Sequence, residues 1–355
     1  MGFRMKVMQT DWDKQVSTQL YNKVENERKK RNYPSLQVSI QIKDKFFHCI
    51  TGLSKRKLRS RATLDSLYYL GSVSKIFVKG VILKLIQDGK MTLDDSIRSY
   101  VDLPPFANDV LIKHLLHHSS GLFDPLDTDL AFPDLIQGKK WTMQEVIQSV
   151  RTSTPLFEPG SERSYSNSGY VLLGKAAEVV GKCPFSQLLN ELILEPLHLT
   201  HTHCPFENDS MPARRLSAGY DSHFYCIEGN GKIVSLSKYP ISLSGSGLMS
   251  GSIVSNSSDL CVFMHNLFEG SLFDDKTKRL SRLFFGTKNL NGVVFREQVG
   301  YLPGYKSFVG HSSDHNLSIA ALANISDRNL LDDAVGNIVE ELLHLELIQG
   351  HSCAV

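Results

Sequence analysis

The residues with the clearest potential for chemistry are a serine and a lysine three positions apart, Ser72 and Lys75. They precede a strongly apolar run, residues 76–86, which predicts a buried helix. Residues three apart lie one turn apart on the same helix face, so the lysine amine would reach the serine hydroxyl. At a helix start the backbone N–H of Ser72 lacks an intrahelical partner and would be free to hold an oxyanion. The pair therefore predicts a serine nucleophile with its own lysine base, the alternative to a Ser-His-Asp triad.

The same spacing has a structural interpretation, in which Ser72 caps the helix and Lys75 is solvated. A second polar group, Tyr165 and Asn167, precedes another apolar run. A tyrosine hydroxyl near a lysine can carry a proton, and an asparagine amide can hold a substrate carbonyl. Burial would lower the pKa of the lysine, and a neighbouring ammonium would lower the pKa of the tyrosine. Which of Lys75 and Tyr165 takes the proton from Ser72 stays open. The alternative is a structural tyrosine followed by a capping asparagine.

The composition is that of a globular protein with nearly balanced charge. The chain has 355 residues, of which 41% are hydrophobic and 21% charged, with a net charge of +2. These values give no indication of a nucleic-acid partner or a membrane surface, and no apolar run predicts a membrane span. The first residues contain no apolar run long enough for a signal peptide. The sequence as it stands predicts a cytoplasmic location, with signal-independent export or a removed leader as alternatives.

No metal site is predicted. Six cysteines are scattered along the chain without a C-x-x-C pair. Cys204 follows His201 and His203, but no second ligand cluster completes a zinc pattern. A further group of histidines is expected to be structural, with no role as ligand or base: His114, His117 and His118.

Apolar patterning predicts a largely helical middle between two regions that contain strands. The expected helices are residues 11–31, 76–86, 110–117, 143–150, 170–180, 185–194, 259–268 and 330–348. The expected strands are residues 36–42, 45–50, 293–298, 307–311 and 317–324, and the basic run 55–61 is expected to be a solvated loop. The expected caps are Asp109, Asn167, and Thr142 with Glu145 in a capping box.

This order of elements predicts three parts. An α/β sheet domain is expected from residues 35–71 and 215–349, at both ends of the chain. A helical domain, residues 72–214, is inserted between them and carries the nucleophile helix and the Tyr165 loop. Residues 1–34 are expected to form a helical extension.

Six segments, in order, resemble a known family, the serine β-lactamase and penicillin-binding-protein superfamily. The most similar branch contains class C β-lactamases, D-Ala-D-Ala carboxypeptidases, D-aminopeptidases and related esterases. The resemblance covers roughly residues 35–345. The segments read LGSVSK (70–75), GKMTLDD (89–95), IKHLLHHSSGL (112–122), PGSERSYSNSGY (159–170), ILEPL (193–197) and GSIVSNSSDL (251–260).

The resemblance implies a β-lactamase-like fold of the α/β (α+β) class, an antiparallel sheet flanked by helices with an inserted helical domain. It implies that Ser72, Lys75 and Tyr165 are catalytic and that Asn167 binds substrate. It also implies that no metal ion or organic cofactor is required.

The third family element is altered in this chain. Relatives usually carry Lys-Thr-Gly or His-x-Gly on an edge strand, and alignment on residues 303–305 puts Gln298 and Gly300 there. Gly300 fits a place where backbone approaches a ligand closely. By the resemblance, Tyr301 supplies a second oxyanion N–H. Gln298 binds substrate without a positive charge, which favours an ester or uncharged amide over a carboxylate-bearing substrate. Arg296 lies on the same strand face and would partly compensate.

We therefore expect a serine hydrolase that acts through an acyl-enzyme on a small-molecule ester, amide or peptide. Three alternatives stay open: an acyltransferase, a β-lactamase or D-peptidase that would need export, and a non-catalytic β-lactamase-like interaction protein. The retained Ser72, Lys75, Tyr165 and Asn167 argue against the last of these. The sequence defines neither the acyl group nor the oligomeric state.

Overall fold

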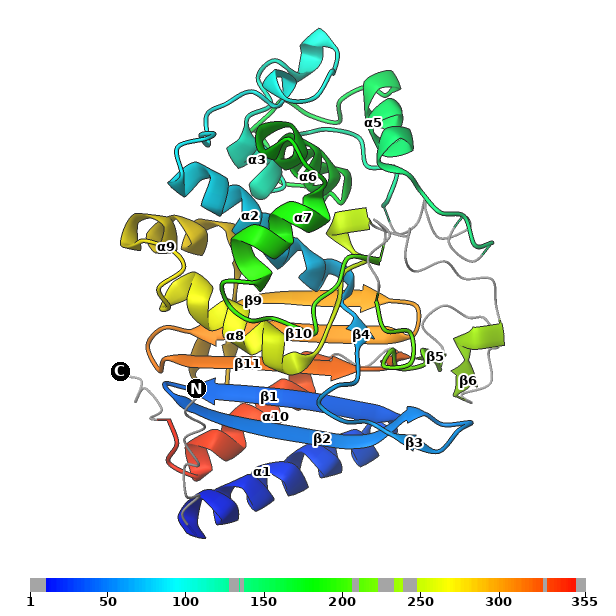
Figure 1. Ribbon diagram of the computed structural model, residues 1–355, viewed down its shortest axis with the longest axis vertical. Helices are drawn as coiled ribbons and strands as arrows, with labels where there is room; N and C mark the ends of the chain where they lie inside the picture. Colours follow the sequence, from blue (N-terminus) through cyan, green and yellow to red (C-terminus); the bar gives the residue numbers. More distant parts are fainter. Residues whose placement is uncertain are drawn as a thin grey trace, which may run out of the picture.

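An antiparallel sheet forms the centre of the protein (Figure 1). The computed structural model describes residues 11–127, 134, 137–205, 211–222, 233–238, 248–327 and 331–348. The sheet has the strand order β3-β2-β1-β11-β10-β9-β8. Its strands are β1 (Ser35–Ile42), β2 (Lys45–Lys55), β3 (Ser60–Arg61), β8 (Gly286–Leu290), β9 (Val293–Leu302), β10 (Tyr305–Ser312) and β11 (Leu317–Ala323). Strand β1 pairs with β11, so segments far apart in the chain share one sheet, as expected for this fold class.

Helices cover both faces of this sheet (Figure 1). The helices are α1 (Asp11–Lys30), α2 (Lys75–Gln87), α3 (Ile112–Leu116), α5 (Met143–Thr152), α6 (Ser168–Gly181), α7 (Phe185–Leu189), α8 (Ser257–Phe268), α9 (Asp275–Ser281) and α10 (Leu331–His344). Single turns are η1 (Gly71–Ser74), η2 (Ile97–Ser99), η3 (Pro105–Ala107), η4 (Asn190–Leu194), η6 (Leu236–Lys238), η8 (Leu248–Ser250) and η9 (Arg282–Phe284). Short strands outside the main sheet are β4 (Tyr68–Tyr69), β5 (Tyr220–Asp221), β6 (Val234–Ser235), β7 (Val254–Ser255) and β12 (Ile325–Ser326).

The central strands are buried on both faces because each face contributes to a separate hydrophobic core. On β11, Ala320 and Leu322 belong to the core beneath α2 and α8, whereas Ile319 and Ala321 belong to the core beneath α1 and α10. Successive side chains of a strand point to opposite faces, which produces this division. The expected division of the chain into three parts stays a prediction.

Three expected elements differ in the structure. Helix α3 begins at Ile112 instead of residue 110, and Asp109 is not its cap. The backbone N–H groups of Ile112 and Lys113 donate to carbonyls of Asp95 and Leu93, so no side-chain cap is needed. The predicted helix 185–194 is divided, because α7 is followed by a π turn, η4. The basic run 55–61 is not entirely a loop, since its ends belong to β2 and β3. The capping box of Thr142 and Glu145 is confirmed.

A buried glutamine connects the sheet to the segment that leads into η1, the turn that contains Ser72. Strand β4 leads into η1 and pairs with β7. Gln37 of β1 donates from Nε2 to the carbonyls of Thr63 at 2.8 Å and Ser66 at 3.1 Å. Its Oε1 accepts from the backbone N–H of Ser257 at 2.7 Å. These bonds satisfy a buried amide and fix the approach to β4 and the start of α8.

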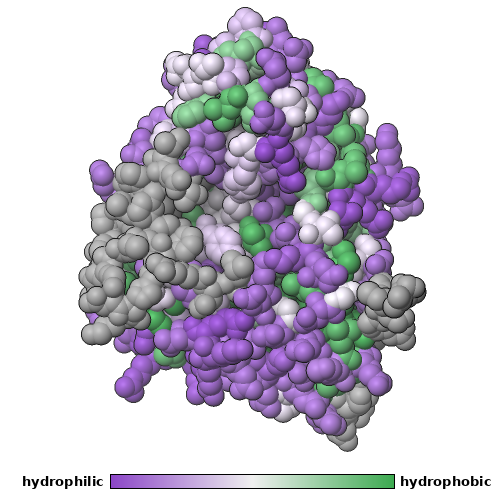
Figure 2. Space-filling model, turned by 180° about the vertical axis from the view of Figure 1, so that it is seen from behind, coloured by the Kyte–Doolittle hydropathy of each residue, from purple (hydrophilic) through white to green (hydrophobic). Residues whose placement is uncertain are grey.

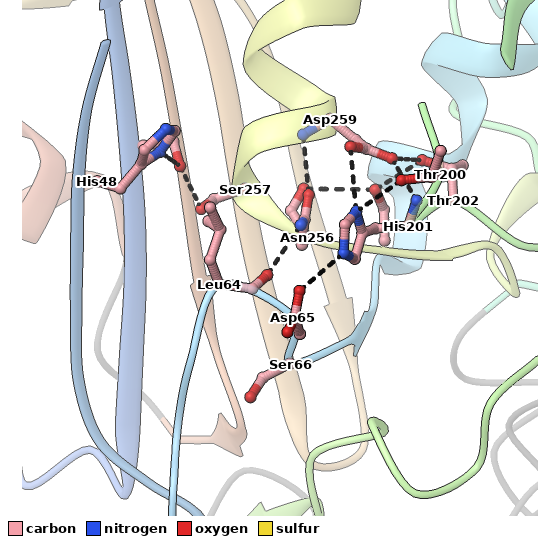
Figure 3. A network of polar contacts seen from close by, with 12 residues as sticks. His48, Leu64, Asp65, Ser66, Thr200, His201, Thr202, Asn256, Ser257 and Asp259 are labelled. Atoms are coloured by element: carbon pink, nitrogen blue, oxygen red, sulfur yellow. Dashed lines mark hydrogen bonds and ion pairs between the residues drawn. The ribbon is translucent and has the colours of Figure 1, made fainter. Parts of the chain in front are cut away.

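His201 belongs to a polar network that fixes the same segment (Figure 3). Its Nε2 lies 3.0 Å from Asp65 Oδ1, and its Nδ1 lies 3.8 Å from Asp259 Oδ1. Asn256 donates from Nδ2 to the carbonyl of Leu64 at 2.8 Å. The segment before β4 is thereby joined to the first turn of α8.

We expect His201→Gln to change how stability depends on pH. The pKa of His201 lies above its ordinary value, mainly because of the buried Asp259 and less because of the exposed Asp65. A raised folded-state pKa adds stability below the unfolded-state value of about 6.5, and this stability is lost as pH rises through the folded-state value. Urea denaturation should show the variant less stable by about 0.5–1 kcal/mol near pH 5.5, with a smaller difference near pH 8. A difference independent of pH would contradict this account.

The surface on the far side of the Figure 1 view is mainly hydrophilic, and its hydrophobic residues form several separate patches (Figure 2). Among the described residues, the most exposed large hydrophobic ones are Leu58, Leu156 and Leu283, from three different segments. Singly exposed apolar residues of this kind are ordinary on a protein surface. Within the described ranges, no helix is both long and apolar enough to cross a membrane.

Candidate active site

The serine and lysine predicted from their spacing are in contact. Ser72 lies in η1, and Lys75 is the first residue of α2, so the serine occupies a 3₁₀ turn just before the α-helix. The Lys75 amine donates from Nζ to Ser72 Oγ at 3.3 Å. Ser72 is half-buried, whereas Lys75 has 0% of its side chain exposed. The interpretation in which Lys75 is solvated is therefore wrong.

Burial of Lys75 changes its proton affinity. Besides Ser72, its Nζ donates to Asn167 Oδ1 at 2.8 Å and to the carbonyl of Ser250 at 3.0 Å. Burial lowers the pKa of Lys75 to about 7, with a smaller raising effect of Asp124 and a lowering effect of the neighbouring cation Lys79. Near neutral pH a large fraction of this lysine is therefore the free amine, which can accept a proton.

Tyr165 contacts the same serine from the opposite side. Its hydroxyl donates to Ser72 Oγ at 2.5 Å, while 49% of the residue remains exposed. Burial of the hydroxyl end raises the pKa of Tyr165 above its ordinary range, so the phenol is protonated at neutral pH. The ring stacks on His118, with ring centres 4.6 Å apart. His118 Nδ1 accepts the backbone N–H of Ser166, and burial lowers the pKa of His118 to about 2. His118 is thus a neutral support for Tyr165.

Asn167 occupies the N-cap position of α6, but its side chain does not cap that helix. Its Oδ1 accepts from Lys75, and its Nδ2 donates to the carbonyl of Leu126 at 2.9 Å. Asp124 supplies the cap instead, since its carboxylate accepts the backbone N–H groups of Asn167 at 2.6 Å and Ser168 at 3.0 Å. The expected capping role of Asn167 is therefore wrong. Because Asp124 caps the helix, the Asn167 carboxamide contacts Lys75 instead.

We expect Asp124→Asn to lower stability and to change the pH dependence of activity. The carboxylate also accepts the N–H of Leu126, so a single amide oxygen cannot serve all three backbone donors. Unfolding should require about 1–3 kcal/mol less free energy in denaturant titrations. Because Asp124 raises the pKa of Lys75, its neutralisation should also move the acidic limb of the pH–rate profile to lower pH. If Asp124→Asn keeps the full stability of the protein and the acidic limb of its pH–rate profile does not move, these roles of Asp124 are contradicted.

Gly300 lets strand β9 lie directly against η1, the turn that contains Ser72. A Cβ atom at Gly300 would lie 2.0 Å from the carbonyl oxygen of Leu70 and 2.9 Å from the backbone nitrogen of Val73. A Cβ at Gly71 would lie 2.7 Å from the backbone nitrogen of Tyr301. Contacts this close leave no room for a side chain. The structure thus brings the backbone of Tyr301 beside the turn that carries Ser72.

Gln298 lies on β9, two residues before Gly300. Its Oε1 accepts a hydrogen bond of 3.1 Å from Lys79 Nζ, a contact that the sequence analysis missed. Arg296, the expected compensating cation, instead donates from Nη1 to Thr287 Oγ1 on β8 at 2.8 Å. A lysine amine therefore reaches Gln298 from α2.

Two residues that contact the candidate site residues, Lys79 and Asp124, were absent from the sequence prediction, and only Lys79 carried a sequence signal. Lys79 is a charged residue within an apolar helix and lies four residues after Lys75, on the same face. That spacing could have identified it. Asp124 carries no comparable pattern, because its role depends on the fold of two separate loops.

The three histidines near the site lie apart from any described metal-binding arrangement. In the described part of the chain, no group of three or more His, Cys, Asp or Glu side chains is arranged to hold a metal ion. His117 packs against the Phe284 ring, with centres 4.7 Å apart, and His114 Nδ1 accepts the backbone N–H of Leu111.

Comparison with known sequences places this geometry in a family. Residues 20–338 match the sequence model of the family described as Beta-lactamase. The chain is a member of the beta-lactamase family. This family includes penicillin-binding-like serine hydrolases, so the resemblance stated from the six segments is confirmed.

Individual relatives and a solved structure show how far the similarity extends. Protein flp of Staphylococcus aureus (strain COL) is 24% identical over 90% of this chain, which spans 64% of the length of that relative. A putative D-alanyl-D-alanine carboxypeptidase of Escherichia coli (strain K12) is 36% identical over 40% of this chain and 35% of its own. A D-amino acid amidase from Ochrobactrum anthropi SV3, solved with L-phenylalanine amide, has a TM-score of 0.82 at 21% identity, covering 94% of this chain and 99% of that one. The expected β-lactamase-like fold is thereby confirmed.

Proposed function

We propose that the protein hydrolyses an ester or amide through an acyl-enzyme on Ser72. The observation that carries this proposal is the double contact on Ser72 Oγ, with the Lys75 amine at 3.3 Å and the Tyr165 hydroxyl at 2.5 Å. A nucleophile held by a base and a proton donor is the arrangement that covalent catalysis needs. A binding module has no use for a buried amine with a pKa near neutrality beside a serine.

The pKa values suggest a division of roles between the two partners. Lys75, with a pKa of about 7, accepts the proton as Ser72 Oγ bonds to the substrate carbonyl carbon. Tyr165 is protonated and donates its proton to the leaving alcohol or amine as the scissile bond breaks. The proton that Lys75 took from Ser72 then passes to the deprotonated Tyr165. In deacylation these transfers run in reverse. Lys75 takes the proton back from Tyr165, and Tyr165 accepts a proton from the attacking water. Lys75 then returns its proton to Ser72 Oγ as the acid leaves.

The negative charge of the tetrahedral intermediate needs donors close to Ser72. The backbone N–H of Ser72 lies in the first turn of η1, where helical N–H groups lack intrahelical partners. The N–H of Tyr301 is the second donor that we propose, because its nitrogen lies beside Gly71. Each such donor contributes roughly 3 kcal/mol to transition-state stabilisation in comparable enzymes.

The substrate class that we propose is a small ester or an uncharged amide. Gln298 has no charge of its own to hold a carboxylate, and Asn167 offers an amide near Lys75. Similarity to a D-amino acid amidase supports an amide of an amino acid as the first compound to try. An alcohol or amine that replaces water would convert the same residues into an acyltransferase.

Turnover of D-phenylalanine amide and p-nitrophenyl acetate, compared in the unmodified protein and Ser72→Ala, tests the proposal. We expect hydrolysis of at least one compound, with a loss of about 10³-fold or more in the variant. Circular dichroism would establish that both proteins are folded. Equal turnover in both would show that Ser72 is not the nucleophile. No turnover of either compound by a folded protein that also fails to acylate would favour the non-catalytic alternative.

A further inference from the structure

The turn that joins β2 to β3 carries a concentration of positive charge. Five of the seven residues 55–61 are lysine or arginine, in a chain whose net charge is only +2. The turn lies beside β5 and β6 at one end of the main sheet (Figure 1). The backbone N–H of Arg56 donates to Tyr220 Oη at 2.7 Å. Close by, the N–H of Ala218 donates to the carbonyl of Ser54 at 2.8 Å. None of these residues belongs to the candidate active site, so the proposed reaction leaves this charge unexplained.

A pocket lies between this turn and the β5–β6 pair. Its volume is about 650 Å³, which is within the range of small-molecule sites. Most of its wall is apolar, and the residues that supply this wall are Leu58, Ala218, Tyr220, Ile233 and Val234. Leu58 is 71% exposed, so an apolar molecule in the pocket would remove part of this side chain from water. The wall therefore favours an occupant that contains an apolar chain.

Three cations of the turn line the same pocket: Lys55, Arg56 and Lys57. The Lys55 amine donates to the carbonyl of Arg214 at 2.9 Å, and the Arg56 guanidinium lies 6.0 Å from the centre of the Tyr220 ring. Lys57 is exposed. Among the described residues, no carboxylate forms an ion pair with any of the three cations. An anionic group would gain charge-assisted hydrogen bonds from these side chains.

We propose that this pocket binds a free amphipathic anion, an alkyl chain that ends in a carboxylate or phosphate. The chain packs on the apolar wall, and the head group meets the cations of the turn. A neutral apolar molecule would leave the cations without a partner, and a short anion would leave the wall uncovered. A bilayer surface fits less well, because most of the apolar residues line a concave pocket instead of protruding. The site is separate from Ser72 and does not depend on the proposed function.

Calorimetry on the unsubstituted protein tests the inference, with each ligand kept below its micelle concentration. Sodium decanoate carries both features, decan-1-ol lacks the charge, and sodium hexanoate has a shorter chain. We expect decan-1-ol to bind about 10-fold more weakly than decanoate, the scale of one charge-assisted hydrogen bond. Hexanoate should bind about 10²-fold more weakly, because fewer methylenes are buried. Decyl phosphate provides the second head group, and binding of either decyl anion with this preference supports the proposal.

Three variants locate the bound anion. Lys57→Glu reverses an exposed charge of the pocket, and Val234→Glu places a carboxylate in its apolar wall. Both should lose about 10-fold in affinity for decanoate, because the new carboxylate repels the head group and competes for the cations. Lys90→Glu makes the same change of net charge as Lys57→Glu at an exposed position outside the pocket, so its affinity should be unchanged. Circular dichroism would establish that each variant is folded.

The inference has clear contrary outcomes. Equal affinities for decanoate and decan-1-ol would show that the cations do not take part. Unchanged affinity for decanoate in both Lys57→Glu and Val234→Glu would place the anion elsewhere on the protein. Flotation with phosphatidylglycerol vesicles, without binding of either free decyl anion, would make the turn a membrane-contact surface and would overturn the assignment of the pocket.

Discussion

Replacement of Lys75 by methionine is expected to lower kcat/KM by about 10²–10⁴-fold, the range for loss of a general base. Methionine fills a similar volume, so the loss should come from chemistry more than from packing. The unsubstituted protein should gain activity as pH rises through about 7, because burial holds the pKa of Lys75 near that value and only the free amine accepts a proton. Initial rates on a p-nitrophenyl ester from pH 5.5 to 9 would measure both effects.

Lys75→Arg is the matched control for charge. A guanidinium keeps the positive charge and the donors toward Asn167 and Ser250, but it stays protonated throughout this pH range. We expect its activity to be as low as that of the methionine variant. An arginine variant with more than a tenth of the original activity would show that Lys75 provides charge and position rather than a base.

Gly300→Ala is expected to reduce activity by about 10²-fold and to destabilise the protein by about 1–3 kcal/mol. The new Cβ would lie 2.0 Å from the Leu70 carbonyl oxygen, so the turn that carries Ser72 and strand β9 must separate. That movement would displace the nucleophile from Lys75, Tyr165 and the backbone of Tyr301 together. Thermal unfolding and steady-state kinetics would measure the two losses.

Gly336→Ala makes the same chemical change where there is room. Gly336 lies within α10, and a Cβ there would meet Leu290 Cδ2 at an ordinary 3.8 Å. Alanine favours a helix over glycine, so stability should rise by about 0.5–1 kcal/mol with activity unchanged. If Gly300→Ala behaved like this control, the close contact between β9 and η1 would not be what positions Ser72.

The sequence predicted the elements whose pattern is local. The apolar runs predicted α2, α6 and α8 within a few residues, and the capping box of Thr142 and Glu145 predicted the start of α5. The motif spacing also identified Ser72, Lys75, Tyr165 and Asn167, which the fold brings together.

Features that depend on distant partners could not be predicted in this way. The start of α3 was wrong because carbonyls of residues 93–95 replace the expected side-chain cap. Strand β8 lies at the edge of the sheet and has a mainly polar sequence. It was missed because this sequence lacks the apolar alternation that predicts a strand. The sequence analysis expected Arg296 on β9 to compensate for the missing cation. The basic residue that contacts Gln298 is instead Lys79 of α2. The role of Asp124 likewise appears only when two loops meet. The assignment of Tyr301 to the oxyanion site stays a prediction.

The most direct test of the central claim is whether Ser72 becomes covalently modified. The protein and Ser72→Ala would each be incubated with a fluorophosphonate, and the intact mass and modified peptide would be determined. The proposed function predicts one adduct per chain, located on Ser72, forming faster as pH rises through about 7 and absent in the variant. A folded protein that forms no adduct, or an adduct that persists in Ser72→Ala, would contradict the assignment of Ser72 as the nucleophile.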